Sequence, residues 1–227
     1  MTTQGSDLPR LVLFAGLGAD ERLFARQRRL RASIEVVKWI DPYPRESFAD
    51  YGRRIAQTIR SPRPFYVAGV SLGGMIALEV ARYIDPIAVI LIASCRSCAA
   101  LPRWGRAGRF IVRAVPASLQ KWANLHTPGA LRALGACEPE ERALIRQMIR
   151  DTPASFLKWG LHEALRWPGV DGLKVPAYHI HGDRDRTIPC PASGVDCVVP
   201  GGGHLINLTH ADHVNRFIQR QILPSIS

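Results

Sequence analysis

The chain has 227 residues, of which 47% are hydrophobic and 22% are charged. This composition is typical of a globular protein and excludes a disordered chain or a coiled coil. No apolar run reaches the roughly 18 residues that a membrane-spanning helix needs, and residues 1–10 lack the basic start of a secretory signal. We therefore expect a soluble cytoplasmic protein with one large domain, or a core that carries an insertion.

The formal net charge is +11, from 30 lysines and arginines against 19 aspartates and glutamates. No acidic residue lies between Asp85 and Glu138. Seven cations fill that interval: Arg96, Arg103, Arg106, Arg109, Arg113, Lys121 and Arg132. A basic segment of this kind can attract an acidic partner, a carboxylate substrate, nucleic acid or anionic lipid. Because 26 of the 30 cations are arginine, a general arginine bias is the alternative explanation.

The five cysteines are odd in number and irregularly spaced, which favours free thiols in a reducing compartment. Cys95 and Cys98 have the spacing of a redox pair, but no second pair follows. The histidines and cysteines lack the spacing of zinc ligands, and the sequence has no complete phosphate-binding or dinucleotide-binding glycine motif. We therefore expect no metal and no other cofactor.

In the first part of the chain, apolar runs typical of buried strands alternate with helical patterns. Strands are predicted at residues 11–15, 34–40, 65–70 and 87–93, and helices at 20–30, 47–59 and 72–84. Ser47 followed by Asp50 indicates a capped start for the second of these helices.

Residues 97–174 contain several helical patterns and no convincing strand. Helices fit residues 130–134, 139–150 and 153–166, and Trp104, Ile111 and Val115 share one face of an earlier helix. Strands resume at 175–181 and 195–199, and a closing helix fits 209–222. This order predicts a parallel α/β sheet with a helical insertion, in which residues 190–194 connect the last two strands almost unaided.

Gly69-Val70-Ser71-Leu72-Gly73 has the pattern G-x-S-x-G and lies between a predicted strand and a predicted helix. A nucleophile elbow needs this setting, because Gly69 and Gly73 allow a strained turn that projects the serine hydroxyl out of the sheet. The N–H groups at the start of the following helix would face negative charge that develops there. The alternative is a glycine-rich turn without chemistry. Ser71 is the candidate nucleophile.

Three loops then resemble those of the α/β-hydrolase superfamily. Gly16-Leu17-Gly18 resembles its His-Gly-x-Gly oxyanion loop, with Ala15 where histidine is common. This likeness implies an oxyanion hole formed by the N–H groups of Leu17 and Leu72, with Gly16 as a supporting glycine. Residues 181–189 resemble the H-G-x-x-D-x-x-(V/I)-P loop, which implies that Asp185 is the triad acid. Residues 200–204 resemble the G-x-x-H loop, which implies that His204 is the base.

Both the acid and the base have rivals nearby. Asp183 lies two positions before Asp185 and could be the acid, although the loop spacing favours Asp185 and a turn-capping role suits Asp183. Four further histidines are close in sequence: His179, His181, His210 and His213. The first two alternate on a strand and the last two lie on the closing helix. His204 is favoured because it follows a strand in a glycine-rich loop, where an exposed imidazole fits.

The resemblance implies a three-layer α/β-hydrolase sandwich with a minimal, mostly parallel six-stranded sheet. Residues 1–96 and 175–227 would form the core, and residues 97–174 a helical cap, or lid, over Ser71. The chain begins with the match to the family's third strand, so the antiparallel hairpin that often opens such sheets is not expected. The cap segment has twelve cations and six acids, which gives it a net charge of +6.

The expected activity is that of a serine hydrolase, which cleaves a carboxylic ester or thioester of a small molecule through an acyl-enzyme. C–C hydrolysis, a lyase reaction or perhydrolysis on the same scaffold is the first alternative, because the fold does not fix the reaction. A non-catalytic basic binding module is the second. We expect neither a nucleic acid nor a membrane as partner.

The cap raises a question about the substrate. Ser-Leu-Gly-Gly at residues 71–74 resembles the elbow of pimeloyl-carrier-protein methyl ester esterases, whose caps meet an acidic carrier protein. This resemblance implies an anionic or carrier-protein-bound ester, selected by the basic cap. A solvated arginine face without any selective role is the alternative.

Overall fold

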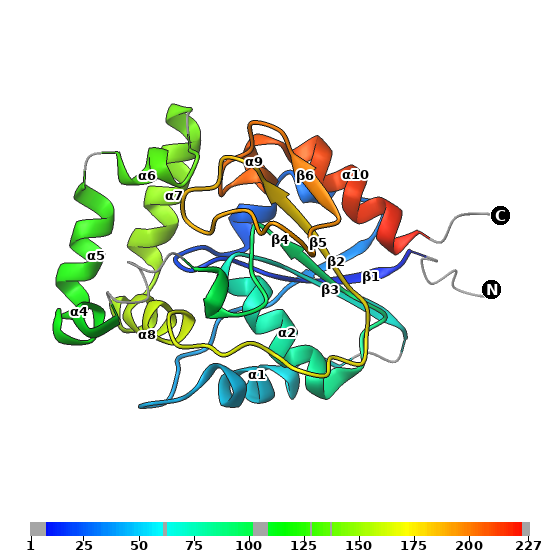
Figure 1. Ribbon diagram of the computed structural model, residues 1–227, viewed down its shortest axis with the longest axis horizontal. Coiled ribbons are helices and arrows are strands. Elements are labelled where there is room, and N and C mark those ends of the chain that lie inside the picture. The colour runs from blue at the N-terminus through cyan, green and yellow to red at the C-terminus, as the bar shows by residue number, and fades with distance from the viewer. Residues whose placement is uncertain (1–7, 61–62, 102–108, 128, 137, 224–227) are drawn as a thin grey trace, which may run out of the picture.

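A six-stranded sheet runs through the middle of the protein (Figure 1). The computed structural model describes residues 8–60, 63–101, 109–127, 129–136 and 138–223. The strands are β1 (Arg10–Phe14), β2 (Ser33–Val36), β3 (Phe65–Val70), β4 (Val89–Ile92), β5 (Ala177–Gly182) and β6 (Cys197–Val199). They lie in the order β2-β1-β3-β4-β5-β6, and every neighbouring pair is parallel. The expected six-stranded sheet is confirmed.

The central strands of this sheet are buried on both faces. Leu11 and Leu13 of β1 point into one hydrophobic core, whereas Val12 and Phe14 point into the other. This division follows from the alternation of side chains along a strand. Because both faces are covered, the strand is a continuous apolar run, which is the pattern that revealed it in the sequence.

Helices cover the two faces of the sheet (Figure 1). One face carries α1 (Phe48–Ala56) and α2 (Leu72–Ile84), which pack against each other. The other face carries the 3-10 turns η1 (Glu21–Phe24) and η2 (Gln27–Arg29), followed by α9 (Ile206–Thr209) and α10 (Ala211–Ile222). Ser47 caps α1, because its Oγ accepts the backbone N–H of Asp50 at 3.1 Å, as the sequence indicated.

Residues 20–30, predicted as one helix, form η1 and η2 instead. The buried Gln27 donates from Nε2 to the main-chain oxygen of Asn207 at 2.9 Å and to Oδ1 of Asn215 at 3.2 Å. These bonds fasten the segment to α9 and α10, so tertiary contacts override its helical pattern. The predicted closing helix at residues 209–222 is present as α10, which begins at Ala211, and the short α9 precedes it.

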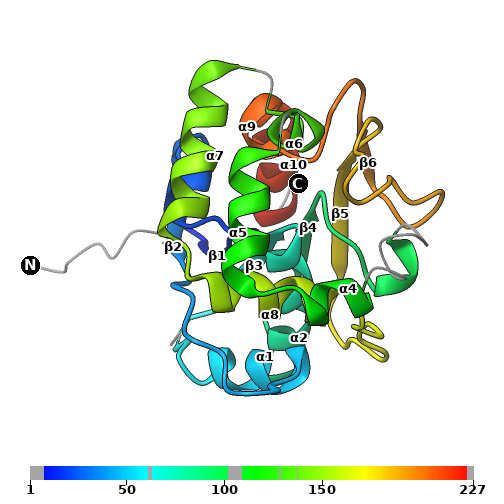
Figure 2. The same ribbon diagram turned by 90° about the vertical axis from the view of Figure 1, so that its left-hand side faces the viewer.

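In the described part of the chain, the turn η3 (Cys98–Ala100) and five helices lie between β4 and β5. The helices are α4 (Arg109–Ala114), α5 (Ala117–His126), α6 (Ala130–Ala133), α7 (Pro139–Asp151) and α8 (Ala154–Ala164). Figure 2 looks onto the end of the molecule where these helices lie in front of the sheet. The helical insertion therefore gathers at one end of the sheet.

The sequence pattern missed α5. Its Leu119 and Trp122 are 52% and 58% exposed, and Leu125 alone of its three large apolar residues packs against the core, so its sequence shows no apolar face. The earlier predicted helix is described only from Arg109 onward, as α4. Trp104 lies outside the described residues, as do Arg103 and Arg106.

The connection from β5 to β6 contains no helix. The two strands are nevertheless parallel, with Ile180 opposite Cys197 and Gly182 opposite Val199. The loop at residues 183–196 therefore crosses over without a helix, as the short spacing predicted.

Candidate active site

Ser71 lies in the sharp turn between β3 and α2, with φ 55° and ψ −122°. A Cβ on Gly69 would lie 2.3 Å from the backbone of Gly73, and a Cβ on Gly73 would lie 2.2 Å from the carbonyl oxygen of Phe14. No larger residue fits at either position. The hydroxyl of the buried Ser94 donates to the carbonyl oxygen of Ser71 at 2.6 Å. Close packing and this hydrogen bond hold the turn.

The structure brings Ser71, His204 and Asp185 together in one chain of hydrogen bonds. The Oγ atom of Ser71 is 2.8 Å from Nε2 of His204, and Nδ1 of His204 is 2.7 Å from Oδ2 of Asp185. His204 and Asp185 are buried, whereas Ser71 is partly exposed. A serine that faces an imidazole, which in turn faces a carboxylate, is the arrangement that activates a hydroxyl for nucleophilic attack.

The carboxylate of Asp185 is held on both of its oxygens. Oδ1 accepts the backbone N–H groups of Thr187 at 2.8 Å and Ile188 at 2.9 Å, and Oδ2 faces His204 and His181. Burial alone would raise the pKa of Asp185, but the hydrogen bonds from His181 and His204 outweigh it and lower the pKa well below its usual range. Asp185 is therefore ionised at neutral pH.

The rival acid Asp183 takes another position. Its Oδ1 accepts the backbone N–H of Gly201 at 2.7 Å, at an exposed point of the structure. Asp183 thereby joins the loop after β5 to the glycine-rich loop after β6, whereas the carboxylate that contacts His204 belongs to Asp185. Among the rival bases, the side chain of His210 contacts the hydroxyl of Thr209 instead.

The two amides predicted for the oxyanion hole lie on neighbouring segments. A Cβ on Gly16 would be in ordinary contact with Cβ of Ser71 at 3.7 Å, so the loop after β1 borders the serine. In the described part of the chain, no hydrogen-bond acceptor pairs with the backbone N–H of Leu17 or Leu72. Two unpaired N–H groups beside a serine can bind a developing oxyanion.

Helices of the insertion contact this site at two points. A Cβ on Gly160 of α8 would lie 2.6 Å from the side chain of Leu17 and 3.1 Å from that of Leu72. A Cβ on Gly135, just after α6, would lie 3.3 Å from the backbone of Gly203 and of His204. The insertion therefore lies directly against both the predicted oxyanion loop and the loop that carries the imidazole.

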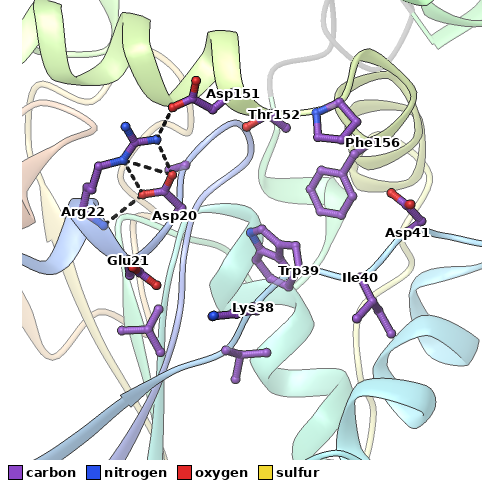
Figure 3. Close-up of a pocket in the computed structure, with 14 residues that line it drawn as sticks. Asp20, Glu21, Arg22, Lys38, Trp39, Ile40, Asp41, Asp151, Thr152 and Phe156 are labelled. Carbon is purple, nitrogen blue, oxygen red and sulfur yellow. Dashed lines mark hydrogen bonds and ion pairs between the residues drawn. The ribbon is translucent and has the colours of Figure 1, made fainter.

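A cavity of about 430 Å³ lies beside the site, between the loops after β1 and β2 and the start of α8 (Figure 3). The rings of Trp39 and Phe156 line it, and Arg22 is hydrogen-bonded to Asp20 and Asp151 at its edge (Figure 3). Its lining begins at Ala19 in the loop after β1 and does not include Ser71. The cavity therefore adjoins the loop after β1 but does not contain the serine.

The sequence patterns left two contributors to the site without a role. Ser94 holds the carbonyl of Ser71, and His181 contacts Asp185. Ser94 carries no motif that could have revealed it. The strand alternation of His179 and His181 was visible, but it did not show that His181 contacts Asp185 or that His179 contacts His181.

Over the residues that the structure describes, no cluster of three His, Cys, Asp or Glu side chains could hold a metal ion. Within the same residues, none of the helices has the length and apolar character to cross a membrane.

Comparison with solved structures gives close matches in fold at low sequence identity. The enol-lactonase from Burkholderia xenovorans LB400 has a TM-score of 0.72 at 19% identity, over 95% of this chain and 91% of that one. A hydrolase from Pseudomonas aeruginosa has a TM-score of 0.70 at 17% identity, over 94% and 89% of the two chains. A type II thioesterase from the yersiniabactin biosynthetic pathway has a TM-score of 0.67 at 17% identity, over 98% and 96%. These likenesses show a shared fold.

Sequence comparison adds a local match and a family. A Synechocystis protein with the provisional description of a non-heme chloroperoxidase is 40% identical over 53 residues. That match spans only 19% of this chain and 19% of the relative. By contrast, residues 7–217 match the alpha/beta hydrolase family as a whole. The match extends over most of the chain and agrees with its parallel sheet and strand-turn-helix serine, and the protein therefore belongs to the alpha/beta hydrolase family.

Proposed function

We propose that the protein is a serine hydrolase that cleaves a carboxylic ester or thioester of a small molecule. The observation that carries this proposal is the hydrogen-bonded chain from Ser71 through His204 to Asp185, with distances of 2.8 and 2.7 Å. The two unpaired amides of Leu17 and Leu72 support it, because ester cleavage develops negative charge on an oxygen.

In the first half of the reaction, His204 takes the hydroxyl proton of Ser71 while Oγ bonds to the acyl carbon. The carbonyl oxygen becomes an oxyanion, which the N–H groups of Leu17 and Leu72 bind. The carbon–oxygen or carbon–sulfur bond then breaks, and His204 returns the proton to the leaving group. An acyl-enzyme on Ser71 and a free alcohol or thiol result.

In the second half, His204 takes a proton from water, whose oxygen bonds to the acyl carbon. The bond between that carbon and Oγ of Ser71 then breaks, His204 returns the proton to Oγ, and a carboxylic acid leaves. Asp185 stabilises the imidazolium in both halves. Residues 97–174 act as a lid in this proposal, supported by the contacts of Gly160 with Leu17 and Leu72 and of Gly135 with the loop of His204. The reaction needs no cofactor.

The test uses p-nitrophenyl esters of increasing acyl length. We expect turnover by the wild type, and a loss of about 10⁴-fold or more in kcat for Ser71→Ala, the loss found when triad members are removed from serine hydrolases. Ser118→Ala, on the exposed surface of α5, serves as the control and should behave as the wild type. Turnover that survives Ser71→Ala would contradict the proposal.

A second candidate is perhydrolysis, in which hydrogen peroxide replaces water. The 40% identity over 53 residues to a provisional non-heme chloroperoxidase favours it. Hydrogen peroxide would give a proton to His204 while its oxygen bonds to the acyl carbon. The bond from that carbon to Oγ of Ser71 would then break, His204 would return the proton to Oγ, and a peracid would leave. Formation of peracetic acid from an acetate ester and peroxide, in preference to acetate, would support this reaction over simple hydrolysis.

A further inference from the structure

Two buried histidines extend the hydrogen-bonded chain beyond Asp185. His179 and His181 alternate on β5 and are 1% and 0% exposed. Nε2 of His181 lies 2.8 Å from the carbonyl oxygen of Ile188 and 3.2 Å from Oδ2 of Asp185. Nε2 of His179 lies 2.9 Å from Nδ1 of His181. A continuous path of polar contacts thus runs from His179 to Ser71.

The partners of these rings define where the protons lie. The carbonyl oxygen of Ile188 and the carboxylate of Asp185 can only accept hydrogen bonds, so Nε2 of His181 carries a proton. In the neutral ring Nδ1 of His181 is then an acceptor, and it receives the N–H at Nε2 of His179. His179 therefore fixes the tautomer of His181 that points an N–H at the carboxylate.

We propose that His181 is a positioning residue for the reaction: its Nε2–H is the second donor, beside His204, on Oδ2 of Asp185. This inference rests on the proposed function, because it assigns His181 a part in the same hydrolysis. His181 acts through Asp185 and touches no substrate.

The second donor has two physical effects on Asp185. It fixes the plane of the carboxylate, whose Oδ1 is already held by two backbone N–H groups. It also disperses negative charge on Oδ2, because the oxygen is shared between two N–H groups. The attraction between Asp185 and the protonated ring of His204 is therefore weaker than it would be if His204 were the carboxylate's only side-chain donor.

Several other charged groups surround this path and bear on its titration. Arg96 and Asp196 lie near His179, and the backbone N–H of His179 donates to Asp196 at 2.6 Å. Burial, together with His181 and Arg96, lowers the pKa of His179 to about 4, so His179 is neutral at pH 7. The pKa of the Cys190 thiol is raised by burial and by the charges of Asp183 and Asp185. None of these groups changes in the variants below.

The experiment compares three variants across a pH series with a p-nitrophenyl ester. His181→Leu removes the donor, and His181→Gln keeps an N–H donor at a similar reach. Ile180→Val alters the same buried strand without touching any of these hydrogen bonds and is the matched control. Should His181→Leu fail to fold, His181→Asn replaces it, because its shorter amide does not reach Oδ2.

For His181→Leu we expect kcat to fall about 10- to 100-fold, the factor that a hydrogen bond to a charged group is typically worth, with KM nearly unchanged. The acid limb of kcat/KM should move to higher pH, because Asp185 then holds the protonated imidazole of His204 more tightly. A merely structural role would loosen Asp185 and move that limb to lower pH or not at all. His181→Gln should restore most of kcat and the original limb.

The inference would be overturned if His181→Leu left kcat and the acid limb of kcat/KM unchanged. It would also be overturned if kcat of His181→Gln were no higher than that of His181→Leu. If the wild type hydrolyses the ester and the His181 variants have the same kcat and pH limb, this inference is contradicted and the proposed function is not. If the wild type is inactive, the proposed function fails, and the ¹⁵N NMR titration of the His204 ring still decides the inference. An upward shift of its midpoint in His181→Leu supports a shared carboxylate, and no shift excludes it.

Discussion

Ser71 occupies a backbone conformation that costs a residue with a side chain about 1–3 kcal/mol, and the site contains the contacts that offset it. Its N–H donates to the carbonyl of Ile92 at 3.0 Å, and Ser94 donates to its carbonyl. This strain is what projects the hydroxyl toward His204. The strained turn therefore places Ser71 at the end of the hydrogen-bonded chain that His204 and Asp185 continue.

The choice between the two aspartates can be tested directly. Asp185→Asn should lower kcat by about 10⁴-fold, because the neutral amide no longer stabilises the imidazolium or fixes its tautomer. Asp183→Asn keeps an acceptor for the N–H of Gly201 and should lower kcat less than about 10-fold. Steady-state kinetics on both variants provides the measurement. A larger loss in Asp183→Asn would show that the acid has been assigned to the wrong residue.

His179 should make the stability of the fold depend on pH. Its pKa is lowered from 6.5 to about 4, so between these values the unfolded chain binds a proton that the folded chain does not. The free energy of unfolding should therefore fall as pH drops from about 6.5 toward 4, by up to about 3.5 kcal/mol at roughly 1.4 kcal/mol per unit. Asp185 adds a loss in the same direction only below about pH 4.

Urea unfolding of the wild type and of His179→Gln at several pH values measures this effect. Glutamine keeps an N–H donor near His181 but does not titrate, so its stability should change less between pH 6.5 and 4. Parallel curves for the two proteins would show that His179 contributes nothing.

Two glycines of the insertion, Gly135 and Gly129, have similar backbone conformations but different surroundings. Gly135 and Gly129 have φ of 90° and 80°, so any side chain strains the backbone at both. Only Gly135 lies against Gly203 and His204, whereas nothing lies within 4 Å of a Cβ on Gly129. The two positions therefore separate backbone strain from displacement of the loop that carries His204.

Gly135→Leu should lower kcat by about 10- to 100-fold, because a misplacement of about 1 Å at a catalytic group has effects of that size. Gly129→Leu should be destabilised about as much as Gly135→Leu but should have the kcat of the wild type. Thermal unfolding and ester kinetics on both variants give the comparison. Equal kcat values in the two variants would mean that the insertion does not help to position His204.

The elements differed in how well the sequence predicted them, for physical reasons. The central strands β1, β3 and β4 and the helix α2 were predicted because burial makes their runs apolar. The loops of Asp185 and His204 were predicted because family motifs fix their spacing. By contrast, η1 and η2 depend on Gln27 reaching Asn207 and Asn215, which are distant in sequence. The pairing of His181 with Asp185 likewise arises only when β5 and the loop after it fold together.

At the scale of the whole molecule, the excess of positive charge is the property most open to a functional role. Some cations of the insertion have structural partners. Lys121 donates to the carbonyl oxygens of Arg150 and Thr152, Lys158 donates to those of Arg113 and Val115, and Arg166 pairs with Glu163 at 3.5 Å. The side chains of Arg113 and Arg132 are exposed. Steering of an anionic substrate would depend on exposed arginines such as these.

We expect kcat/KM for an ω-carboxylate ester to exceed that for its neutral analogue at low salt. The preference should fade as the screening length shortens to about 3 Å near 1 M salt. Arg113→Gln with Arg132→Gln should reduce it, whereas Arg63→Gln, on the loop before β3, serves as a control outside the insertion. Equal kcat/KM values for both esters at every salt concentration would show that the positive charge of the insertion does not select the substrate.

Labelling by a fluorophosphonate, followed by mass spectrometry of the intact protein and its peptides, shows whether Ser71 is a nucleophile. We expect one adduct, on Oγ of Ser71. Ser71→Ala should carry no adduct while its circular dichroism spectrum stays that of the wild type. We also expect much slower labelling in His204→Ala, because the hydroxyl then has no base to accept its proton. No adduct on the folded wild type, or equal labelling of Ser71→Ala, would contradict the claim that this protein is a serine hydrolase.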